Sequence, residues 1–364
     1  MTPRVLLTTG GAGFIGSNFV HYCQGQYSKG QYSKGQYSEI CVLDALTYAG
    51  NRATLGDLEG QDGFHLIEGN ICDAGLVAQI LAAHQIDTVV HFAAESHVDR
   101  SISGPAAFVQ TNVVGTFTLL EAFRHHWQER GKPEQFRFLH VSTDEVFGSL
   151  GPDDPAFSEV TPYAPNSPYS ASKAGSDHLV RAYFHTYGLP TLITNCSNNY
   201  GPYQFPEKLI PLMCINILLG KPLPVYGDGQ NIRDWLHVED HCRALEAVLL
   251  KAKPGETYNI GGNNQVKNID IVEQICDLME SWAGELPISP KKLITFVGDR
   301  PGHDRRYAMN IAKIQRDLSW QPHYDFATGL KQTVDWYLTH RDWWQPLLSD
   351  EYQGYYAALY GDRP

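Results

Sequence analysis

The sequence predicts a doubly wound α/β fold, in which helices cover both faces of a parallel sheet, with a smaller C-terminal lobe beside it. Short apolar runs alternate with longer helical patterns through the first half of the chain. After about residue 200 the alternation becomes less regular and prolines crowd one stretch. The length of 364 residues suffices for two lobes with a ligand site between them.

The apolar runs are short enough to be strands, and the stretches between them have the spacing of amphipathic helices. The predicted strands span residues 5–7, 40–43, 64–67, 88–92 and 138–141. The predicted helices span about 14–23, 73–84, 106–128, 169–187, 238–251 and 269–283. Gly188 and then Pro190 end the fourth helix, because glycine favours a left-handed C-cap and proline cannot continue a helix.

The composition excludes several classes of protein. With 28 basic and 40 acidic side chains the formal net charge is -12, which argues against nucleic acid as a partner. The seven cysteines are scattered and include no Cys-x-x-Cys pair, so we expect reduced thiols and no metal site. The N-terminal apolar stretch is too short for a signal peptide, and no apolar run reaches the length of about eighteen residues that a membrane span needs. We therefore expect a cytoplasmic protein without membrane contact.

A glycine-rich turn, Gly10-Gly-Ala-Gly13-Phe-Ile-Gly16, follows the first predicted strand and begins the first predicted helix. Free backbone N–H groups at such a helix start can bind the pyrophosphate of a dinucleotide, although a tight turn that packs a helix against a strand is the simpler alternative. Asp44 ends the second strand, where its carboxylate can accept hydrogen bonds from ribose hydroxyls and repel a 2′-phosphate. The motif therefore predicts a site for NAD rather than NADP.

The interval between Gly16 and Asp44 exceeds the usual spacing of about twenty residues. A five-residue tandem repeat, Gln-Tyr-Ser-Lys-Gly over 26–30 and 31–35 and in part over 36–38, accounts for the excess. Its period cannot bury one face, so we expect an expanded surface loop rather than a binding element.

Tyr169 and Lys173 lie four residues apart on a predicted helix, so both side chains project from one face. A lysine ammonium beside a phenol stabilises the phenolate and lowers the tyrosine pKa, which suits a base that takes a hydroxyl proton during hydride transfer. Such a pair also occurs by chance, as a surface lysine beside a packing tyrosine. The position after the fifth strand of a dinucleotide fold favours the catalytic interpretation.

The fifth strand leads into Thr143, Asp144 and Glu145, which places two carboxyl groups at the carboxyl edge of the sheet, where such folds bind ligands. Loss of water needs a base at one carbon and an acid at the leaving hydroxyl of its neighbour, and two adjacent acids can supply both. Consecutive strand residues face opposite sides, so both reach one ligand only if the strand ends here, as Gly148 suggests. The alternative is an exposed acidic pair in a loop.

With these motifs the chain resembles the extended short-chain dehydrogenase/reductase family, and within it the 4,6-dehydratases of nucleotide-linked sugars. The resemblance covers nearly the whole chain and also rests on residues 44–51, 93–101, 198–209 and 300–307. The Thr-Asp-Glu triplet separates this group from the related sugar-nucleotide epimerases. The resemblance implies a Rossmann domain over residues 1–200 that binds NAD and is rejoined by about 235–262, and a substrate-binding lobe over 201–364.

The resemblance further implies dTDP-glucose as the substrate and a homodimer formed through the helices near 106–128 and 169–187. Tyr169, aided by Lys173 and Thr143, would take the C4 hydroxyl proton while hydride passes to NAD. Glu145 would then remove the C5 proton while protonated Asp144 assists departure of the C6 hydroxyl. Return of the hydride to C6 would give a 4-keto-6-deoxy sugar and regenerate NAD. A dehydratase of a UDP- or GDP-linked hexose and a non-catalytic dinucleotide sensor are the alternatives.

Two sets of binding residues complete the prediction. Besides Tyr169 and Lys173, the cofactor set is Gly10, Gly13, Phe14, Ile15, Gly16, Asp44, Ala45, Leu46, Thr47, Asn70, Ile71, Phe92, Ala93, Ala94, Ser96, Thr111 and Asn199. The substrate set is Ser96, Thr143, Asn198, Lys208, Leu209, Pro224, Val225, Tyr226, Arg233, Asn268, His303, Asp304, Arg305, Arg306 and Tyr307. Among these, Lys208, Arg233 and Arg305 or Arg306 would supply the cations that a diphosphate needs. Asn70 replaces the aspartate usual in the family, and its amide oxygen can still accept from the adenine amino group.

Overall fold

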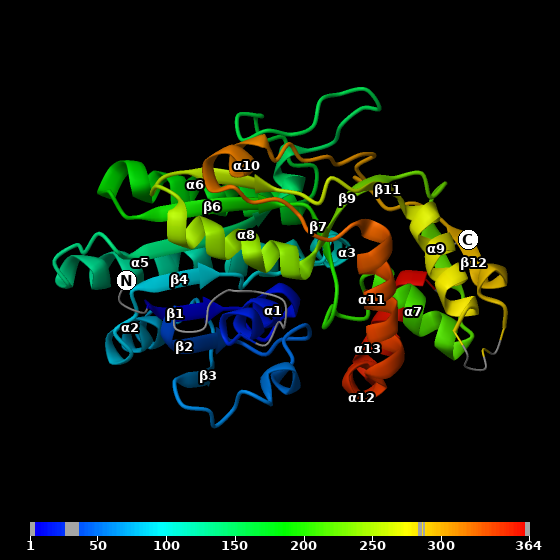
Figure 1. Cartoon of the computed structure of the whole chain (residues 1–364), viewed down its shortest axis with the longest axis horizontal. Coiled ribbons are helices and arrows are strands. Elements are labelled where there is room, and N and C mark those ends of the chain that lie inside the picture. The colour runs from blue at the N-terminus through cyan, green and yellow to red at the C-terminus, as the bar shows by residue number, and fades with distance from the viewer. Residues whose placement is uncertain (1–3, 26–35, 283–285, 287, 361–364) are drawn as a thin grey trace.

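The computed structural model describes residues 4–25, 36–282, 286 and 288–360. Its centre is a seven-stranded parallel sheet with the order β10-β6-β5-β4-β1-β2-β3 (Figure 1). The strands are β1 Arg4–Thr9, β2 Tyr37–Asp44, β3 Phe64–Glu68, β4 Thr88–His91, β5 Arg137–Thr143, β6 Thr191–Cys196 and β10 Thr257–Ile260. All five predicted strands are confirmed. The strand order reverses between β1 and β4, which is the point where doubly wound sheets bind ligands.

Helices cover both faces of this sheet, as predicted (Figure 1). On one face lie α2 Ala74–Ala83, α5 Thr116–Glu129 and α6 Pro168–Tyr187, and on the other lie α1 Phe14–Cys23, α8 Val238–Lys251 and α10 Ala312–Leu318. Neighbouring residues of β1 show the alternation, because Leu6 belongs to the core beneath α1 and α8, whereas Leu7 belongs to the core beneath α2 and α5. Both side chains are fully buried.

The helix predicted over 106–128 is interrupted by a π-helical turn. It consists of α4 Pro105–Phe108, the π-helical segment η2 Val109–Gly115, and α5. Within the π turn, Asn112 accepts a hydrogen bond from the Glu95 backbone N–H at 2.9 Å and donates to the Ser172 hydroxyl at 2.8 Å. π turns often mark functional sites, and this one ties the loop after β4 to α6.

Helix α6 has a strong start signal. The Ser167 hydroxyl accepts from the Ser170 backbone N–H at 3.0 Å, and the Ser170 hydroxyl accepts from the Ser167 N–H at 3.0 Å, which forms a capping box with Pro168 in the first turn. Gly188 ends the helix with φ +71°, as predicted. These signals fix Tyr169 in the first turn of α6.

The C-terminal part of the chain builds a second core beside the large sheet. Its strands are β7 Asn198–Tyr200, β9 Ile232–His237 and β11 Gln265–Lys267 in one small sheet, and β8 Leu223–Tyr226 with β12 Ile294–Val297 in another. Its main helices are α7 Leu209–Leu219, α9 Asn268–Glu280 and α11 Phe326–Thr339. Because β10 returns to the large sheet beside β6, the chain crosses between the two parts more than once. The domain boundary near residue 200 stays a prediction.

Short helical segments complete the fold. They are η1 Arg52–Leu55, α3 Val98–Ser103, η3 Asp144–Phe147, η4 Pro290–Leu293, α12 Arg341–Trp344, η5 Gln345–Leu347 and α13 Asp350–Tyr360. The aromatic tail packs on the second core, where Trp344 is buried, and Trp343 donates to the Thr54 hydroxyl at 3.0 Å in the first part of the chain. The tail therefore links the two parts of the molecule.

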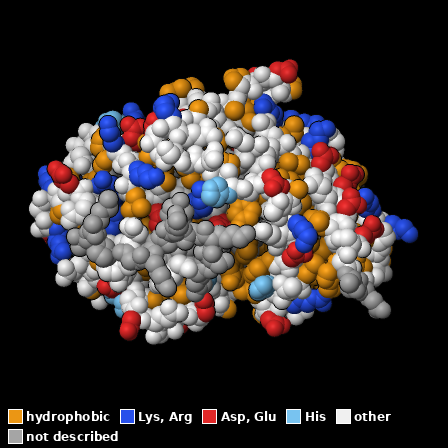
Figure 2. Space-filling model, in the orientation of Figure 1, with side chains coloured by type: hydrophobic (Ala, Val, Ile, Leu, Met, Phe, Trp, Pro, Cys, Tyr) orange, Lys and Arg blue, Asp and Glu red, His pale blue; other side chains and the backbone are white. Residues whose placement is uncertain are grey.

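The predicted repeat loop falls mainly on residues 26–35, which lie outside the described residues; β2 begins inside the partial third copy, at Tyr37. Acidic and basic side chains lie interspersed over the face shown in Figure 2. Among the helices that the structure describes, none is long and apolar enough to cross a bilayer. All seven cysteines are free.

Candidate active site

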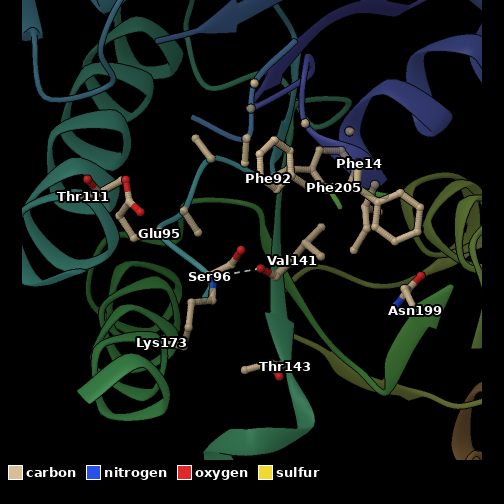
Figure 3. A pocket seen from close by; sticks show the side chains of 18 of the residues that line it. Phe14, Phe92, Glu95, Ser96, Thr111, Val141, Thr143, Lys173, Asn199 and Phe205 are labelled. Carbon is tan, nitrogen blue, oxygen red and sulfur yellow. Dashed lines mark hydrogen bonds between the residues drawn. The ribbon is translucent and has the colours of Figure 1, made fainter. Parts of the chain in front are cut away.

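A pocket opens at the carboxyl edge of the large sheet, where the ends of β1, β2, β4, β5 and β6 meet. Of the predicted cofactor residues, only Leu46 is absent from its lining. Figure 3 shows the rings of Phe14, Phe92 and Phe205 toward one end of the pocket and Thr143 toward the other, with Val141 between them. The pocket therefore has an apolar, aromatic end and a polar end.

The glycine turn fits a dinucleotide. Gly10 adopts φ +69°, and a Cβ atom at Gly16 would approach the Gly10 carbonyl oxygen to 2.2 Å, so neither position accepts a side chain. Asp44 accepts hydrogen bonds from the backbone N–H groups of Ala12 at 2.9 Å and Leu46 at 2.8 Å. The backbone of Leu46 thus helps to orient the carboxylate of Asp44. Each carboxylate oxygen keeps a lone pair for a ribose hydroxyl.

Asn70 lies in the lining, and its amide oxygen accepts from the Cys72 backbone N–H at 2.9 Å. This bond fixes the orientation of the amide and leaves the oxygen a second lone pair for an adenine amino group.

Thr143, Asp144 and Glu145 all line the polar end of the pocket. Strand β5 ends at Thr143, the 3₁₀ turn η3 begins at Asp144, and Gly148 adopts φ +87° beyond it. Because the strand ends before Asp144, the side chains of both acids can reach the same pocket. The Thr143 hydroxyl donates to Asp144 at 3.3 Å and accepts from the Glu145 backbone N–H at 3.2 Å, which holds the three residues as one unit.

The two acids differ in their surroundings. Burial, followed by the negative charge of Glu145, raises the pKa of Asp144 well above its usual range. Burial also raises the pKa of Glu145, but the positive charges of Arg300, Arg233 and Lys208 oppose the shift. Asp144 is therefore the better proton donor and Glu145 the better base.

Replacing Asp144 with asparagine is expected to change how stability depends on pH. Because the folded pKa of Asp144 is raised, the unfolded chain releases this proton first as pH rises, and the free energy of unfolding falls between the two pKa values. The variant lacks this titration. Denaturant unfolding at pH 5 and pH 8 should show the stability of the variant, relative to wild type, increasing with pH; a difference independent of pH would contradict the assignment.

Tyr169 and Lys173 are both buried and line the same end of the pocket. The Lys173 ammonium donates to the Val141 carbonyl at 2.9 Å (dashed line in Figure 3). Burial raises the pKa of Tyr169 well above its usual value and lowers the pKa of Lys173, while a hydrogen bond from Thr143 lowers the pKa of Tyr169. Burial outweighs the hydrogen bond from Thr143, and the effect of Lys173 on the tyrosine pKa stays a prediction.

The predicted substrate residues fall into two groups. Ser96, Thr143, Asn198 and Lys208 line the pocket. The others lie outside its lining, on or beside elements of the second part of the chain: Leu209, Pro224, Val225, Tyr226, Arg233, Asn268, His303, Asp304, Arg305, Arg306 and Tyr307. The segment 303–307 runs beside β9, where the Tyr307 backbone N–H donates to the Ile232 carbonyl at 3.1 Å.

The predicted cations are not equivalent. Arg233 is buried, donates to the Asp304 carbonyl at 2.9 Å, and its charge acts on both Asp144 and Glu145. Arg305 pairs with Asp228 at 2.8 Å in an exposed salt bridge, and Arg306 donates to the Gly151 and Asp154 carbonyls. Lys208 and Arg233 thus face the acids, whereas Arg305 and Arg306 have partners elsewhere.

Sequence reasoning missed several residues of the site. Glu95, Gln204 and Glu207 line the pocket, and Arg300 is the first of the positive charges that lower the pKa of Glu145. Arg300 also contacts Asp99 at 3.4 Å. Its place at the start of the segment 300–307 was a signal, since that segment carries part of the family resemblance.

Comparisons with known proteins agree with this geometry. A family model described as GDP-mannose 4,6 dehydratase matches residues 7–333. A dTDP-glucose 4,6-dehydratase from Xanthomonas campestris pv. campestris (strain B100) is 56% identical over 350 residues, which cover 95% of this chain and 97% of the relative. The dTDP-glucose 4,6-dehydratase 1 of Escherichia coli (strain K12) is 52% identical over 368 residues, 98% of this chain and 99% of the relative. The chain belongs to the dTDP-glucose 4,6-dehydratase family.

The solved structures of this family confirm the Rossmann-type fold. The dTDP-glucose 4,6-dehydratase of Streptomyces venezuelae, crystallised with NAD and a second ligand, superposes with a TM-score of 0.84 at 47% identity over 94% of this chain and 100% of that chain. The seven-stranded parallel sheet and its flanking helices are therefore those of a dTDP-glucose 4,6-dehydratase. The family resemblance predicted from the motifs is confirmed.

Proposed function

We propose that the protein converts dTDP-glucose to dTDP-4-keto-6-deoxyglucose and water, using NAD that is regenerated in every turnover. The observation that carries this proposal is the convergence of Asp144, Glu145, Tyr169 and Lys173 on one pocket. A simple dehydrogenase needs only the tyrosine and lysine, whereas dehydration also needs the acid pair. Relatives at 56% and 52% identity carry the name of this enzyme, which supports the proposal over a non-catalytic dinucleotide sensor.

The proposed proton transfers use four side chains. NAD, when bound, accepts the hydride from C4 and returns it to C6. Tyr169 takes the proton of the C4 hydroxyl, and Thr143 stabilises the phenolate through its hydrogen bond. The resulting ketone acidifies the C5 hydrogen, which Glu145 removes. Protonated Asp144 donates to the C6 hydroxyl, which leaves as water, and Glu145 returns its proton to C5 when the hydride reaches C6. Exchange with solvent then moves the proton held by Tyr169 to Asp144, so both side chains return to their starting states.

Lys173 has a positioning part in this scheme. Its ammonium bonds to the Val141 carbonyl at 2.9 Å and lies 3.4 Å from His140 Nε2, so it ties α6 to β5, the strand that leads into the two acids. The same positive charge sits beside the pocket, where it favours a negatively charged reaction intermediate.

A comparison of substrates tests which nucleotide base the protein prefers. The family model carries the name of a GDP-mannose enzyme, whereas relatives more than half identical are named for dTDP-glucose. We expect kcat/KM for dTDP-glucose to exceed that for UDP-glucose and GDP-mannose by at least about tenfold, since a site built around one base rejects another by such factors. Equal or better turnover of UDP-glucose or GDP-mannose would overturn the assignment of the base.

We also infer a homodimer formed through the helical stretches 105–129 (α4, η2 and α5) and 168–187 (α6). Large apolar side chains are exposed on these stretches: Val109, Val114, Phe117 and Tyr187. Apolar side chains grouped in this way support a protein contact, and a second copy of the chain fits the family resemblance. Phe117→Asp is expected to shift the protein from dimer to monomer in size-exclusion chromatography with light scattering. Val160→Asp, which changes an 88% exposed residue in the loop before α6, is the control and should leave the mass unchanged.

We further propose a cytoplasmic location. All seven cysteines are free, and six of them are buried. A secreted protein with this many cysteines would normally form disulfides. Fractionation of cells that produce the protein tests the proposal, which a periplasmic or extracellular pool would contradict.

A further inference from the structure

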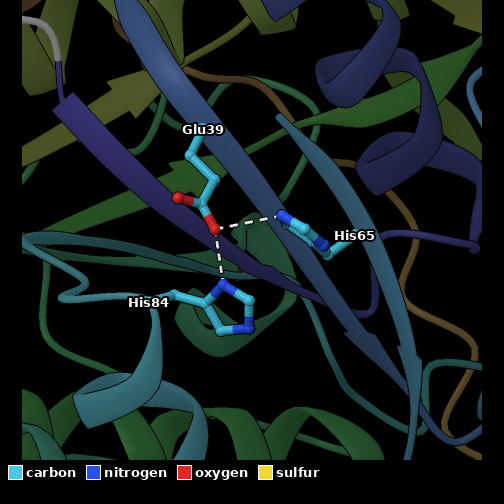
Figure 4. A group of neighbouring side chains, drawn as sticks. All are labelled: Glu39, His65 and His84. Carbon is cyan, nitrogen blue, oxygen red and sulfur yellow. Dashed lines mark hydrogen bonds and ion pairs between the residues drawn. The ribbon is translucent and has the colours of Figure 1, made fainter. Parts of the chain in front are cut away.

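Three potential metal ligands meet on the large sheet, far along the strands from the active-site edge. Glu39 is the third residue of β2, His65 is the second residue of β3, and His84 follows α2 (Figure 4). His65 Nε2 lies 3.1 Å from Glu39 Oε1, and His84 Nδ1 contacts the same oxygen. One ligand atom from each residue lies within 4.8 Å of the other two. The pocket of the active site is at the opposite, carboxyl ends of these strands.

The fold explains why these residues meet. Cys41 pairs with His65 in the register of β2 and β3, and Glu39 lies two residues before Cys41 on the same face of the strand. Helix α2 covers this face, and His84 caps its C-terminus through a backbone N–H bond to the Ile80 carbonyl at 3.1 Å. The carboxyl end of a helix carries partial negative charge, which favours a cation.

The ligand chemistry and the spacing of His65 and Glu39 fit a small divalent ion. Bonds of about 2.0 to 2.2 Å from zinc to nitrogen and oxygen place neighbouring ligands of a tetrahedron about 3.3 to 3.5 Å apart, close to the 3.1 Å between His65 and Glu39. Two imidazoles and a carboxylate with an open position form a common zinc ligand set. The side chains of Glu39, His65 and His84 are 27%, 44% and 23% exposed, which leaves water access to the open position.

The surroundings support such a site. A surface hollow lined by Glu59, Gly60, His65 and His84, among others, lies beside the ligands and has room for a water ligand. The Cys41 thiol lies 3.7 Å from Glu39 Oε1 and donates to it, so it orients the carboxylate from the buried side. Hydrogen bonds to ligating groups are the usual second layer of metal sites in proteins.

We propose that Glu39, His65 and His84 bind one divalent transition-metal ion of the zinc class, with water as the fourth ligand. The ion joins β2, β3 and the end of α2. At their other ends β2 and β3 lead to Asp44 and Asn70, so the ion braces the two strands that position the adenosine half of the proposed cofactor site. The sequence predicts no metal site because its three ligands are far apart along the chain and follow no metal motif.

Isothermal titration of the untagged full-length protein with zinc chloride tests the proposal. We expect one site per chain that His65→Gln, His84→Gln and Glu39→Gln each weaken at least about tenfold, as even outer-sphere changes do at metal sites. His125→Gln is the matched control, because His125 pairs with Glu121 at 3.6 Å without a second histidine. This control should bind zinc like wild type. Unchanged zinc affinity in the His65 and His84 variants, or no zinc binding by wild type, overturns the proposal.

Two further measurements separate loss of the ion from loss of the fold. Cobalt(II), used as a probe, should give the visible absorption of a low-coordinate site in wild type and in His125→Gln, and lose it in His65→Gln. Saturating zinc should raise the Tm of wild type and of His125→Gln but not that of His65→Gln. Circular dichroism and dehydratase turnover without added metal should match wild type in all variants, since the ligands lie outside the active site. A visible cobalt spectrum that survives in His65→Gln would place the bound ion elsewhere and contradict the proposal.

Discussion

Glu145→Gln is expected to abolish dehydration while the first oxidation continues. The amide cannot take the C5 proton, so the reaction stops at the 4-keto sugar with the cofactor reduced. General base catalysis contributes about 10² to 10⁴-fold, and we expect kcat to fall by that factor. The near-ultraviolet absorbance of reduced cofactor after mixing with dTDP-glucose measures the first step. Mass spectrometry in ²H₂O measures exchange at C5.

A companion variant tells the two acids apart. Asp144→Asn keeps Glu145, so solvent deuterium should still enter C5 although water is not lost. Glu145→Gln should show neither deuterium uptake nor water loss. Wild-type deuterium uptake by Glu145→Gln would remove Glu145 as the base, and uptake lost in both variants would mean that the acids act only as one unit.

Tyr169→Phe is expected to block the reaction before the acids act. Without the phenol no group takes the C4 hydroxyl proton, so reduction of the cofactor should slow by about 10² to 10⁴-fold. The change keeps the aromatic ring, which packs edge-on against Phe108 with the two ring centroids 6.2 Å apart, so the fold should persist. Single-turnover absorbance of the reduced cofactor measures the effect.

Tyr163→Phe is the matched control for this variant. Tyr163 is partly buried and donates to Asp177 at 2.9 Å, but it does not line the pocket. Tyr163→Phe should lower the free energy of unfolding, but it should slow reduction of the cofactor much less than Tyr169→Phe does. Cofactor reduction at the wild-type rate in Tyr169→Phe would contradict the role of the phenol.

Local sequence signals predicted the parts of the site that depend on short-range structure. The glycine turn, Asp44 at the end of β2, and the start of α6 just before Tyr169 each follow from residues within a few positions. The end of β5 at Thr143 was conditional on Gly148, whose φ of +87° confirms the turn. These features need no knowledge of distant contacts.

Features that depend on long-range packing were not predicted. The π turn over Val109–Gly115 forms where Asn112 bonds to Glu95 and Ser172, which are distant in sequence. Arg300 acts on Glu145 across the two parts of the chain. The carbonyl partner of Lys173 likewise depends on how α6 packs on β5.

Internal hydride transfer within one pocket is the central claim, and dTDP-glucose labelled with deuterium at C4 tests it most directly. With catalytic amounts of enzyme and no added reductant, we predict a product lighter by one water that carries the label at C6. A product without deuterium at C6, or one formed only while NADH accumulates, would contradict the account.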